Sequence, residues 1–113
     1  MCLIFGNHTQ EDIILRKELE LLAEANENFD VVHVLSGLSE EETPPDGGYK
    51  GYVSSDIIIK HFPEPSADSL VYVCGPPPMM KAVCGDKNPD KSQGELVGIL
   101  KDLGYGADSV YKF

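Results

Sequence analysis

Short apolar runs alternate with amphipathic and polar stretches along the 113 residues of this chain. Four runs predict β-strands, because each is short and rich in β-branched or aromatic residues: 2–5, 31–35, 70–74 and 109–113. The continuous apolar character of the second run is typical of parallel strands that are buried on both faces. The pattern therefore predicts a parallel sheet of about four strands.

The longest amphipathic stretch predicts a helix that ends at about Asn26. Thr9 and Asp12 have the spacing of a residue pair that caps the start of a helix. Leucines recur at the spacing of one helical face, so they predict an apolar stripe that packs against the sheet: Leu15, Leu19 and Leu22.

Shorter helices are predicted in the second half of the chain. A helix at 56–62 follows two serines that can cap it, and residues 79–83 are predicted to form a helical turn. The S-x-x-E sequence at 92–95 has the form of a capping box and predicts a helix that ends at Gly104. This order of strands and helices predicts one α/β domain, a three-layer Rossmann-like parallel sheet.

Composition excludes several classes of function. Nine basic and nineteen acidic residues give a net charge of −10, which argues against a nucleic-acid partner. The three cysteines are an odd number without C-x-x-C spacing, so neither a disulfide framework nor a metal site is expected. No apolar run approaches the ~20 residues of a membrane helix, and no leader is recognisable. We therefore expect a soluble chain.

The strand at 70–74 runs into an unusual turn, Cys74-Gly75-Pro76-Pro77-Pro78-Met79. Three prolines cannot continue a strand ladder, because each lacks an N–H group and fixes φ. Glycine lets the backbone turn tightly or lie close to a flat ligand. The turn is thus a rigid feature at the carboxyl end of a strand, where open α/β sheets bind their ligands.

This turn resembles the nicotinamide-binding turn of the cytochrome b5 reductases, which are flavoprotein pyridine-nucleotide reductases. Other stretches are similar to the same family: FGNHTQEDIILRKEL at 5–19, GYVS at 51–54 and QGEL at 93–96. The tail to Phe113 resembles the mitochondrial type of fungi and plants. The resemblance implies a ferredoxin-reductase-like lobe that binds NADH, whose hydride passes to FAD and whose electrons then reach cytochrome b5.

Two elements of the family do not occur in residues 1–113: the FAD barrel with its R-x-Y-(S/T) motif, and a first strand with a G-x-G-x-x-(P/T) turn. The resemblance therefore implies a partial NAD(P)H-binding domain, with FAD on a missing amino-terminal domain. We expect this part alone to bind nucleotide weakly and to catalyse nothing. We also expect self-association, because the absent strand would leave unpaired sheet edges.

Two alternatives remain open for the function: the reductase module of a nitrate reductase, and a truncated structural or interaction domain without activity. Intact members of the family are anchored to mitochondrial or endoplasmic-reticulum membranes. They face the cytosol or the intermembrane space.

On the nicotinamide side, the resemblance places Cys74 between the nicotinamide and the flavin, where it shapes the path of the hydride. The alternative for this thiol is a buried core residue. Gly75, Pro76 and Met79 are expected to form a shelf under the nicotinamide and its ribose. Their alternative is a strand terminator whose methionine fills the core.

On the adenosine side, the resemblance places Asn7, His8 and Asp12 near the ribose. Asp12 has the alternative of acting only as a helix cap. Ser36 stands where the family has an acidic residue that repels a 2′-phosphate, so NADPH is not excluded as a cofactor. Glu40 to Glu42 could supply that charge, or form a solvated loop.

Tyr52 is expected to pack its ring on the adenine. Its alternative is an ordinary interface aromatic.

Overall fold

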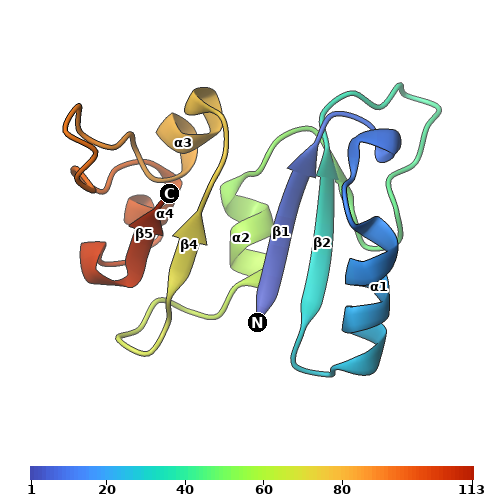
Figure 1. The fold of residues 1–113 in the computed structure, drawn as a ribbon, viewed down its shortest axis with the longest axis horizontal. Helices are drawn as coiled ribbons and strands as arrows, with labels where there is room; N and C mark the ends of the chain where they lie inside the picture. The colour runs from blue at the N-terminus through green and yellow to red at the C-terminus, as the bar shows by residue number, and fades with distance from the viewer. The chain divides into compact units, whose positions relative to one another are not determined.

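A computed structural model describes all residues from Met1 to Phe113. The chain divides into two compact units, Met1–Val53 and Ser54–Phe113. Each unit contains its own parallel sheet (Figure 1). The predicted α/β fold with parallel strands is confirmed. The prediction of one sheet of about four strands is wrong, because five strands form two sheets, and the additional strand is a short one after the acidic loop.

The first unit is built on a three-stranded sheet of order β1-β2-β3. Its elements in chain order are β1 (Cys2–Asn7), η1 (Gln10–Asp12), α1 (Arg16–Ala25), β2 (Asp30–Leu35) and β3 (Tyr49–Lys50). β1 and β2 pair in parallel from Cys2↔Asp30 to Asn7↔Leu35, so both strands end at the same edge of the sheet.

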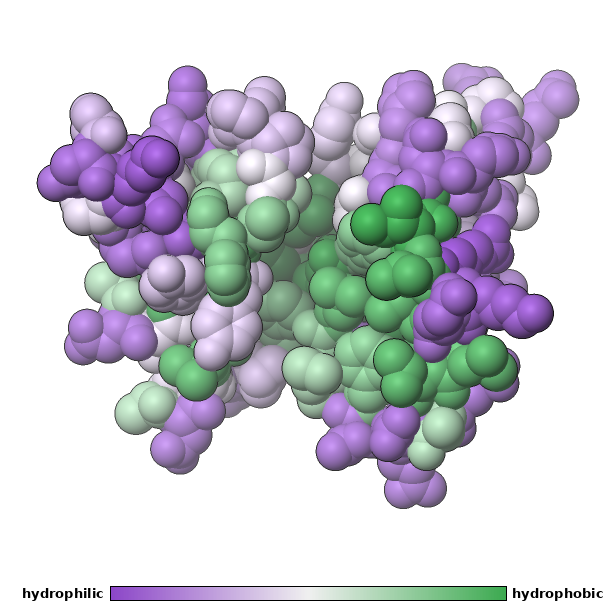
Figure 2. Space-filling model, in the orientation of Figure 1, coloured by the Kyte–Doolittle hydropathy of each residue, from purple (hydrophilic) through white to green (hydrophobic).

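The helix predicted to run from residue 10 to Asn26 is interrupted. η1 is a single 3-10 turn, and Leu15 has a left-handed backbone with φ 54°, so α1 begins only at Arg16. The predicted apolar stripe is wrong for Leu15 and Leu22, which are 63% and 52% exposed, while Leu19 is half-buried. Leu15 is the left-handed residue before α1, so it does not continue the helical face, whereas Leu22 lies within α1 and is exposed there. Apolar side chains gather over β1, β2 and the start of α1 in Figure 2.

The second unit is built on the pair β4-β5. Its elements in chain order are α2 (Ser55–His61), β4 (Val71–Val73), α3 (Pro77–Val83), α4 (Ile99–Asp102), η2 (Ala107–Ser109) and β5 (Val110–Lys112). The Ser54 hydroxyl accepts a hydrogen bond from the Ile57 amide at 3.5 Å, so the predicted serine cap of α2 is confirmed. α3 begins two residues earlier than predicted, because proline suits the first turn of a helix.

The helix predicted from residue 92 to Gly104 is wrong over most of its length. Only Ile99–Asp102 is helical, since Gly94 and Gly98 have φ of 71° and 79°. Ser92 does not cap a helix, because its hydroxyl donates to Asp90 at 2.6 Å.

Buried apolar side chains form the interior of each unit. In the first unit they are Ile13, Val32, Val34 and Leu35; in the second they include Ile57, Ile58, Val73, Met80, Cys84, Leu100 and Val110. His33 lies in β2 and is also buried, but neither ring nitrogen has a hydrogen-bond partner.

Candidate functional site

The carboxyl ends of β1 and β2 bring three of the predicted site residues together. The Ser36 amide donates to the Asn7 carbonyl at 3.1 Å. One residue further on, the Gly37 amide donates to the His8 carbonyl at 2.7 Å. His8 Nδ1 and Ser36 Oγ lie 3.3 Å apart, within hydrogen-bond distance. Asn7, His8 and Ser36 are therefore neighbours at the edge where parallel α/β sheets bind ligands.

Gly37 fixes the position of the His8 ring. A Cβ at Gly37 would lie 2.5 to 2.7 Å from three atoms of the imidazole, so the ring packs directly on the glycine backbone. Any larger residue at this position would displace the ring. No sequence pattern indicated this contact.

The side chain of Asn7 carries a buried donor without a partner. Its Nδ2 atom is buried and makes no hydrogen bond in the chain. Buried amide groups in proteins are nearly always hydrogen-bonded, because an unpaired one retains its desolvation penalty. An acceptor oxygen of a bound polar ligand at this strand end would satisfy the Asn7 amide.

Asp12 forms the cap that the sequence predicted. Its carboxylate accepts hydrogen bonds of 2.9 Å from both the amide and the hydroxyl of Thr9. These bonds lower the pKa of the Asp12 carboxyl, and the neighbouring His8 lowers it further. The carboxylate is thus already occupied by the chain, which favours the capping role.

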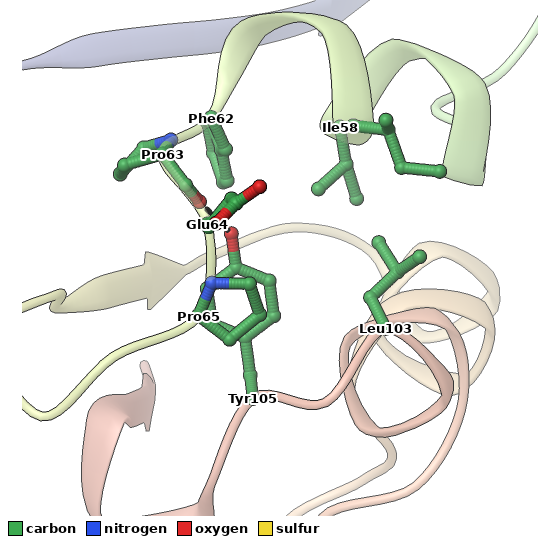
Figure 3. A pocket seen from close by; sticks show the side chains of 8 residues that line it. Ile58, Phe62, Pro63, Glu64, Pro65, Leu103 and Tyr105 are labelled. Atoms are coloured by element: carbon green, nitrogen blue, oxygen red, sulfur yellow. Dashed lines mark hydrogen bonds between the residues drawn. The ribbon is translucent and has the colours of Figure 1, made fainter.

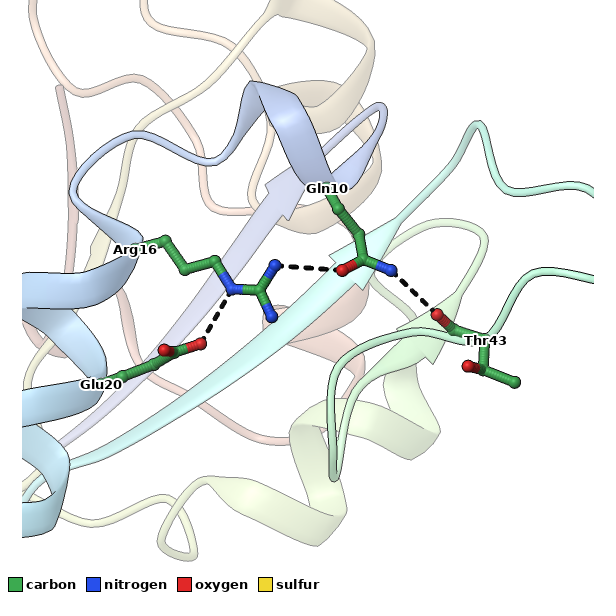
Figure 4. A network of polar contacts seen from close by, with 4 residues as sticks. All are labelled: Gln10, Arg16, Glu20 and Thr43. Atoms are coloured by element: carbon green, nitrogen blue, oxygen red, sulfur yellow. Dashed lines mark hydrogen bonds and ion pairs between the residues drawn. The ribbon is translucent and has the colours of Figure 1, made fainter.

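A polar network connects α1, η1 and the loop that follows β2 (Figure 4). Arg16 Nε pairs with Glu20 at 2.8 Å, and another guanidinium nitrogen of Arg16 donates to Gln10 Oε1 at 3.0 Å. Gln10 Nε2 in turn donates to the Thr43 carbonyl at 3.1 Å. The i,i+4 spacing of Arg16 and Glu20 is the one part of this network that a sequence can indicate.

The acidic run Glu40–Glu42 lies in that loop and is exposed. The carboxylate of Glu42 accepts from the Ser39 amide at 3.3 Å. The Lys50 ammonium donates to the carbonyls of Ser39 and Glu40, each at 3.0 Å. The loop therefore bonds to itself and to a cation on β3, as expected of a solvated acidic loop.

Tyr52 follows Gly51, whose positive φ of 102° turns the chain after β3. Its side chain is 82% exposed. An exposed ring presents a free face for stacking on a planar ligand.

The remaining predicted residues surround the turn after β4, within the second unit. Cys74 directly follows Val73 and is exposed, so the prediction of a buried core thiol as its alternative is not supported. Gly75 and Pro76 lead into α3. A Cβ at Gly75 would overlap the end of the Met79 side chain, so glycine lets that side chain lie against the turn.

The base of the turn is held by hydrogen bonds in which at least one partner is a backbone group. The Phe113 amide donates to the Val73 carbonyl at 2.9 Å. On Lys112, the amide donates to Gln93 Oε1 at 2.7 Å and the carbonyl accepts from Gln93 Nε2 at 2.9 Å. The Lys112 side chain is buried, and its ammonium donates to the carbonyls of Asp86 and Glu95. We call these contacts the Gln93–Lys112 clamp, which the sequence did not indicate.

A small apolar cavity of about 90 Å³ lies elsewhere in the second unit (Figure 3). Tyr105 closes part of it, and its hydroxyl donates to the Pro63 carbonyl at 2.6 Å. Burial raises the pKa of this hydroxyl. Ligand pockets usually measure about 300–1,000 Å³, so this cavity is too small for a dinucleotide.

No three His, Cys, Asp or Glu side chains are grouped closely enough to hold a metal ion. No helix has the length and apolar character that crossing a membrane requires.

Comparison with known proteins gives a consistent result. Residues 1–85 match the family model of the oxidoreductase NAD-binding domain. The chain is 45% identical to NADH-cytochrome b5 reductase 2 of Mycosarcoma maydis, over 98% of this chain and 31% of that protein. It is 43% identical to NADH-cytochrome b5 reductase 2 of Saccharomyces cerevisiae, over 98% of this chain and 36% of that protein. The chain thus spans about a third of the length of these curated relatives.

Solved structures show the same fold. The cytochrome b5 reductase domain of Ulva prolifera nitrate reductase aligns with 98% of this chain and 37% of that chain, with a TM-score of 0.74 and 23% identity. The CS-b5R domains of human Ncb5or, in the NAD⁺ form, align with 99% of this chain and 27% of that chain, with a TM-score of 0.70 and 29% identity.

Proposed function

Because the chain belongs to the oxidoreductase NAD-binding domain family, we propose that it is the NADH-binding portion of a cytochrome b5 reductase. The observation that carries this proposal is the group formed by Asn7, His8 and Ser36 at the carboxyl ends of β1 and β2. This group lies within the residues that match the family model.

The adenosine half of the nucleotide is assigned to the first unit. Asn7 offers an amide donor that the chain leaves unpaired, and Ser36 offers a hydroxyl beside His8. These groups fit the hydroxyls of a ribose, which both donate and accept hydrogen bonds. The exposed ring of Tyr52 is assigned to the adenine face. Asp12 is left as a cap that positions the η1 turn next to His8.

The nicotinamide half is assigned to the turn after β4. Cys74 is exposed at the end of that strand, and the glycine and prolines that follow form a fixed surface with Met79 against it. A rigid turn orients a bound ring at little entropic cost, which is the main requirement for transfer between two rings. Cys74 therefore acts as a positioning group, and no step of the proposal makes it a nucleophile.

When bound, NADH supplies a hydride, which the FAD of the complete reductase accepts and delivers as single electrons to cytochrome b5. The proposal assigns FAD to a part of the complete reductase outside the third of its length that this chain spans. The residues of this chain bind and orient the nucleotide.

Calorimetric titration of the 113-residue chain with NAD⁺ tests the proposal. We expect weak saturable binding, and we expect Asn7→Ala to weaken it by roughly fivefold or more through loss of one buried hydrogen bond. Asn26→Ala is the matched control, because the Asn26 side chain is exposed at the end of α1 and bonds only to the Leu22 carbonyl. Binding that is lost equally in both variants, or no binding by the parent chain, would contradict the proposal.

A further inference from the structure

The outer edge of β5 is completed by a side chain in place of a strand. In a parallel pair of strands, alternate residues direct their backbone groups to opposite sides. The Phe113 amide faces β4, where it donates to the Val73 carbonyl at 2.9 Å. The amide and the carbonyl of Lys112 both bond to the side-chain amide of Gln93, at 2.7 and 2.9 Å. Gln93 therefore satisfies the edge of β5 as a neighbouring strand would.

These bonds lie at the level where the turn after β4 begins. Lys112 is the register partner of Val73, which is the last residue of β4. Cys74 comes next, so the contacts that fix Lys112 also fix the point from which the turn starts. β5 is only three residues long, and a pair of short strands has little stability without further contacts. Gln93 supplies such a contact.

The Lys112 side chain secures the other end of the turn. It is only 2% exposed, and its ammonium donates to the Asp86 carbonyl at 3.2 Å and to the Glu95 carbonyl at 2.8 Å. Asp86 belongs to the segment that follows α3, the helix into which the turn leads. In that segment the Gly85 amide donates to the Met80 carbonyl at 2.7 Å. Lys112 thus contacts both the strand before the turn and the segment that closes the helix after it.

A glycine brings Gln93 to this position. Gly94 has a positive φ of 71°, and a Cβ on it would lie 2.8 Å from the Asp86 carbonyl oxygen. Glycine is the residue that tolerates both the left-handed backbone and such a close approach. The loop therefore runs against the segment after α3, and the neighbouring Gln93 reaches β5.

We propose that Gln93 and Lys112 are positioning residues for the nicotinamide half of the nucleotide. They do not touch the ligand. They hold β5 and the end of α3 so that Cys74 and Gly75 keep one orientation before the nicotinamide ring binds. This inference rests on the proposed function, which assigns the nicotinamide to this turn. A turn that is ordered in advance loses no conformational entropy on binding, so its rigidity increases the affinity.

Nicotinamide mononucleotide is the probe, and amide NMR titration of the 113-residue chain gives its dissociation constant. We expect Gln93→Ala to weaken binding by roughly twofold to tenfold, because a mobile turn must become ordered when the ligand binds. Ser92→Ala is the matched control in the same loop. The Ser92 hydroxyl contacts Asp90 and Asn88 within that loop, so this variant should keep the affinity of the parent.

A purely stabilising role of Gln93 would give a different result. The titrations are made at a temperature where denaturation curves show each variant to be folded, so that a loss of stability alone leaves the affinity unchanged. Backbone relaxation of ¹⁵N is a second measurement, and it needs no ligand. In the parent, the Cys74 and Gly75 amides should have order parameters of about 0.85, as in a rigid backbone, and Gln93→Ala should lower them. Values below about 0.6 in the parent would overturn the proposal without any variant.

The outcomes separate this proposal from the proposed function. If nicotinamide mononucleotide shifts the Cys74, Gly75 and Met79 amides with equal affinity in the parent and in Gln93→Ala, the positioning role is wrong and the proposed function stands. The positioning role is also wrong if Ser92→Ala weakens binding as much as Gln93→Ala does. If the probe shifts none of these amides in the parent, the assignment of the nicotinamide to this turn is wrong, and the positioning role is wrong with it.

Discussion

The two units position their candidate residues by different means. In the first unit, the candidate groups are polar side chains at strand ends. Asn7 offers an amide, His8 an imidazole and Ser36 a hydroxyl. In the second unit, the candidate feature is the backbone of the turn after Cys74. Glycine and proline fix this turn, and a hydrogen bond at Val73 anchors it. Polar groups that select a ligand and a rigid surface that orients one are separate requirements, and we propose that separate units of this chain meet them.

Two glutamines give the sharpest contrast between the units. Each makes two hydrogen bonds, but Gln93 satisfies the part-buried backbone of β5. Gln10 links the Thr43 carbonyl to Arg16, and its bond to Thr43 is exposed. We expect Gln93→Ala to lower the free energy of unfolding of the second unit by about 2–4 kcal/mol, because two backbone groups lose their partners.

Gln10→Ala is the matched control and should cost the first unit about 1 kcal/mol or less, since water can replace its partners. Urea denaturation followed by residue-resolved NMR measures both. An equal loss of unfolding free energy in the two variants would show that the Gln93–Lys112 clamp stabilises its unit no more than the Gln10 contacts stabilise theirs.

The next effect concerns selection by side chains. In a reductase completed with its FAD domain, Ser36→Asp should increase the preference for NADH over NADPH by about 1–3 kcal/mol, because a carboxylate repels the 2′-phosphate. Steady-state kcat/KM ratios for the two cofactors measure this change. Ser39→Asp adds the same charge three residues further along the loop and should have a smaller effect. An unchanged ratio in Ser36→Asp would indicate that the Glu40–Glu42 loop, and not residue 36, discriminates between the two cofactors.

The matching test in the second unit concerns orientation. Cys74→Ser in the same complete reductase should slow flavin reduction by roughly tenfold or less, while the affinity for NADH stays nearly unchanged. Stopped-flow reduction at several NADH concentrations separates the two quantities. Weakened affinity with a normal rate of reduction would make Cys74 a binding contact and remove its positioning role.

The smallest expected effect is a pH dependence of the stability of the first unit. Burial lowers the pKa of His33, and the charge of Arg16 lowers it further while Glu20 opposes the change. A His whose pKa is lowered in the folded state favours folding when neutral. The stability that neutral His33 contributes is therefore fully present above the unfolded pKa of about 6.5. It is lost as pH falls below that value.

His33→Phe should remove this slope in the stability of the first unit. The substitution also eliminates two buried nitrogens that have no partner, so the variant should be no less stable than the parent at about pH 5.5. Stability measured across this pH range checks both statements. A slope that persists in His33→Phe would assign the titration to another group.

The sequence predicted local structure well wherever a residue acts through its own backbone or its near neighbours. Ser54 caps α2, Thr9 and Asp12 cap η1, and the four predicted strands form in parallel pairs. Ser36 was placed correctly at the end of β2, because strand ends can be located from apolar runs.

Features that depend on distant contacts were not predictable. The 92–95 sequence looks like a capping box, but Gln93 bonds to Lys112, and Asp90 takes the Ser92 hydroxyl. The leucine stripe assumed an unbroken helix, and the left-handed backbone at Leu15 interrupts it. The packing of His8 on Gly37 joins two strand ends that are 28 or more residues apart, as the His8–Ser36 contact shows.

We propose that the first unit binds the adenosine half of NADH and that the second unit binds the nicotinamide half. Amide NMR mapping of the 113-residue chain with two half-ligands tests it most directly. Adenosine 5′-monophosphate should shift the amides of Asn7, His8, Ser36 and Gly37. Nicotinamide mononucleotide should shift those of Cys74, Gly75 and Met79. Exchange of the two patterns, or shifts spread evenly over both units, would contradict the assignment.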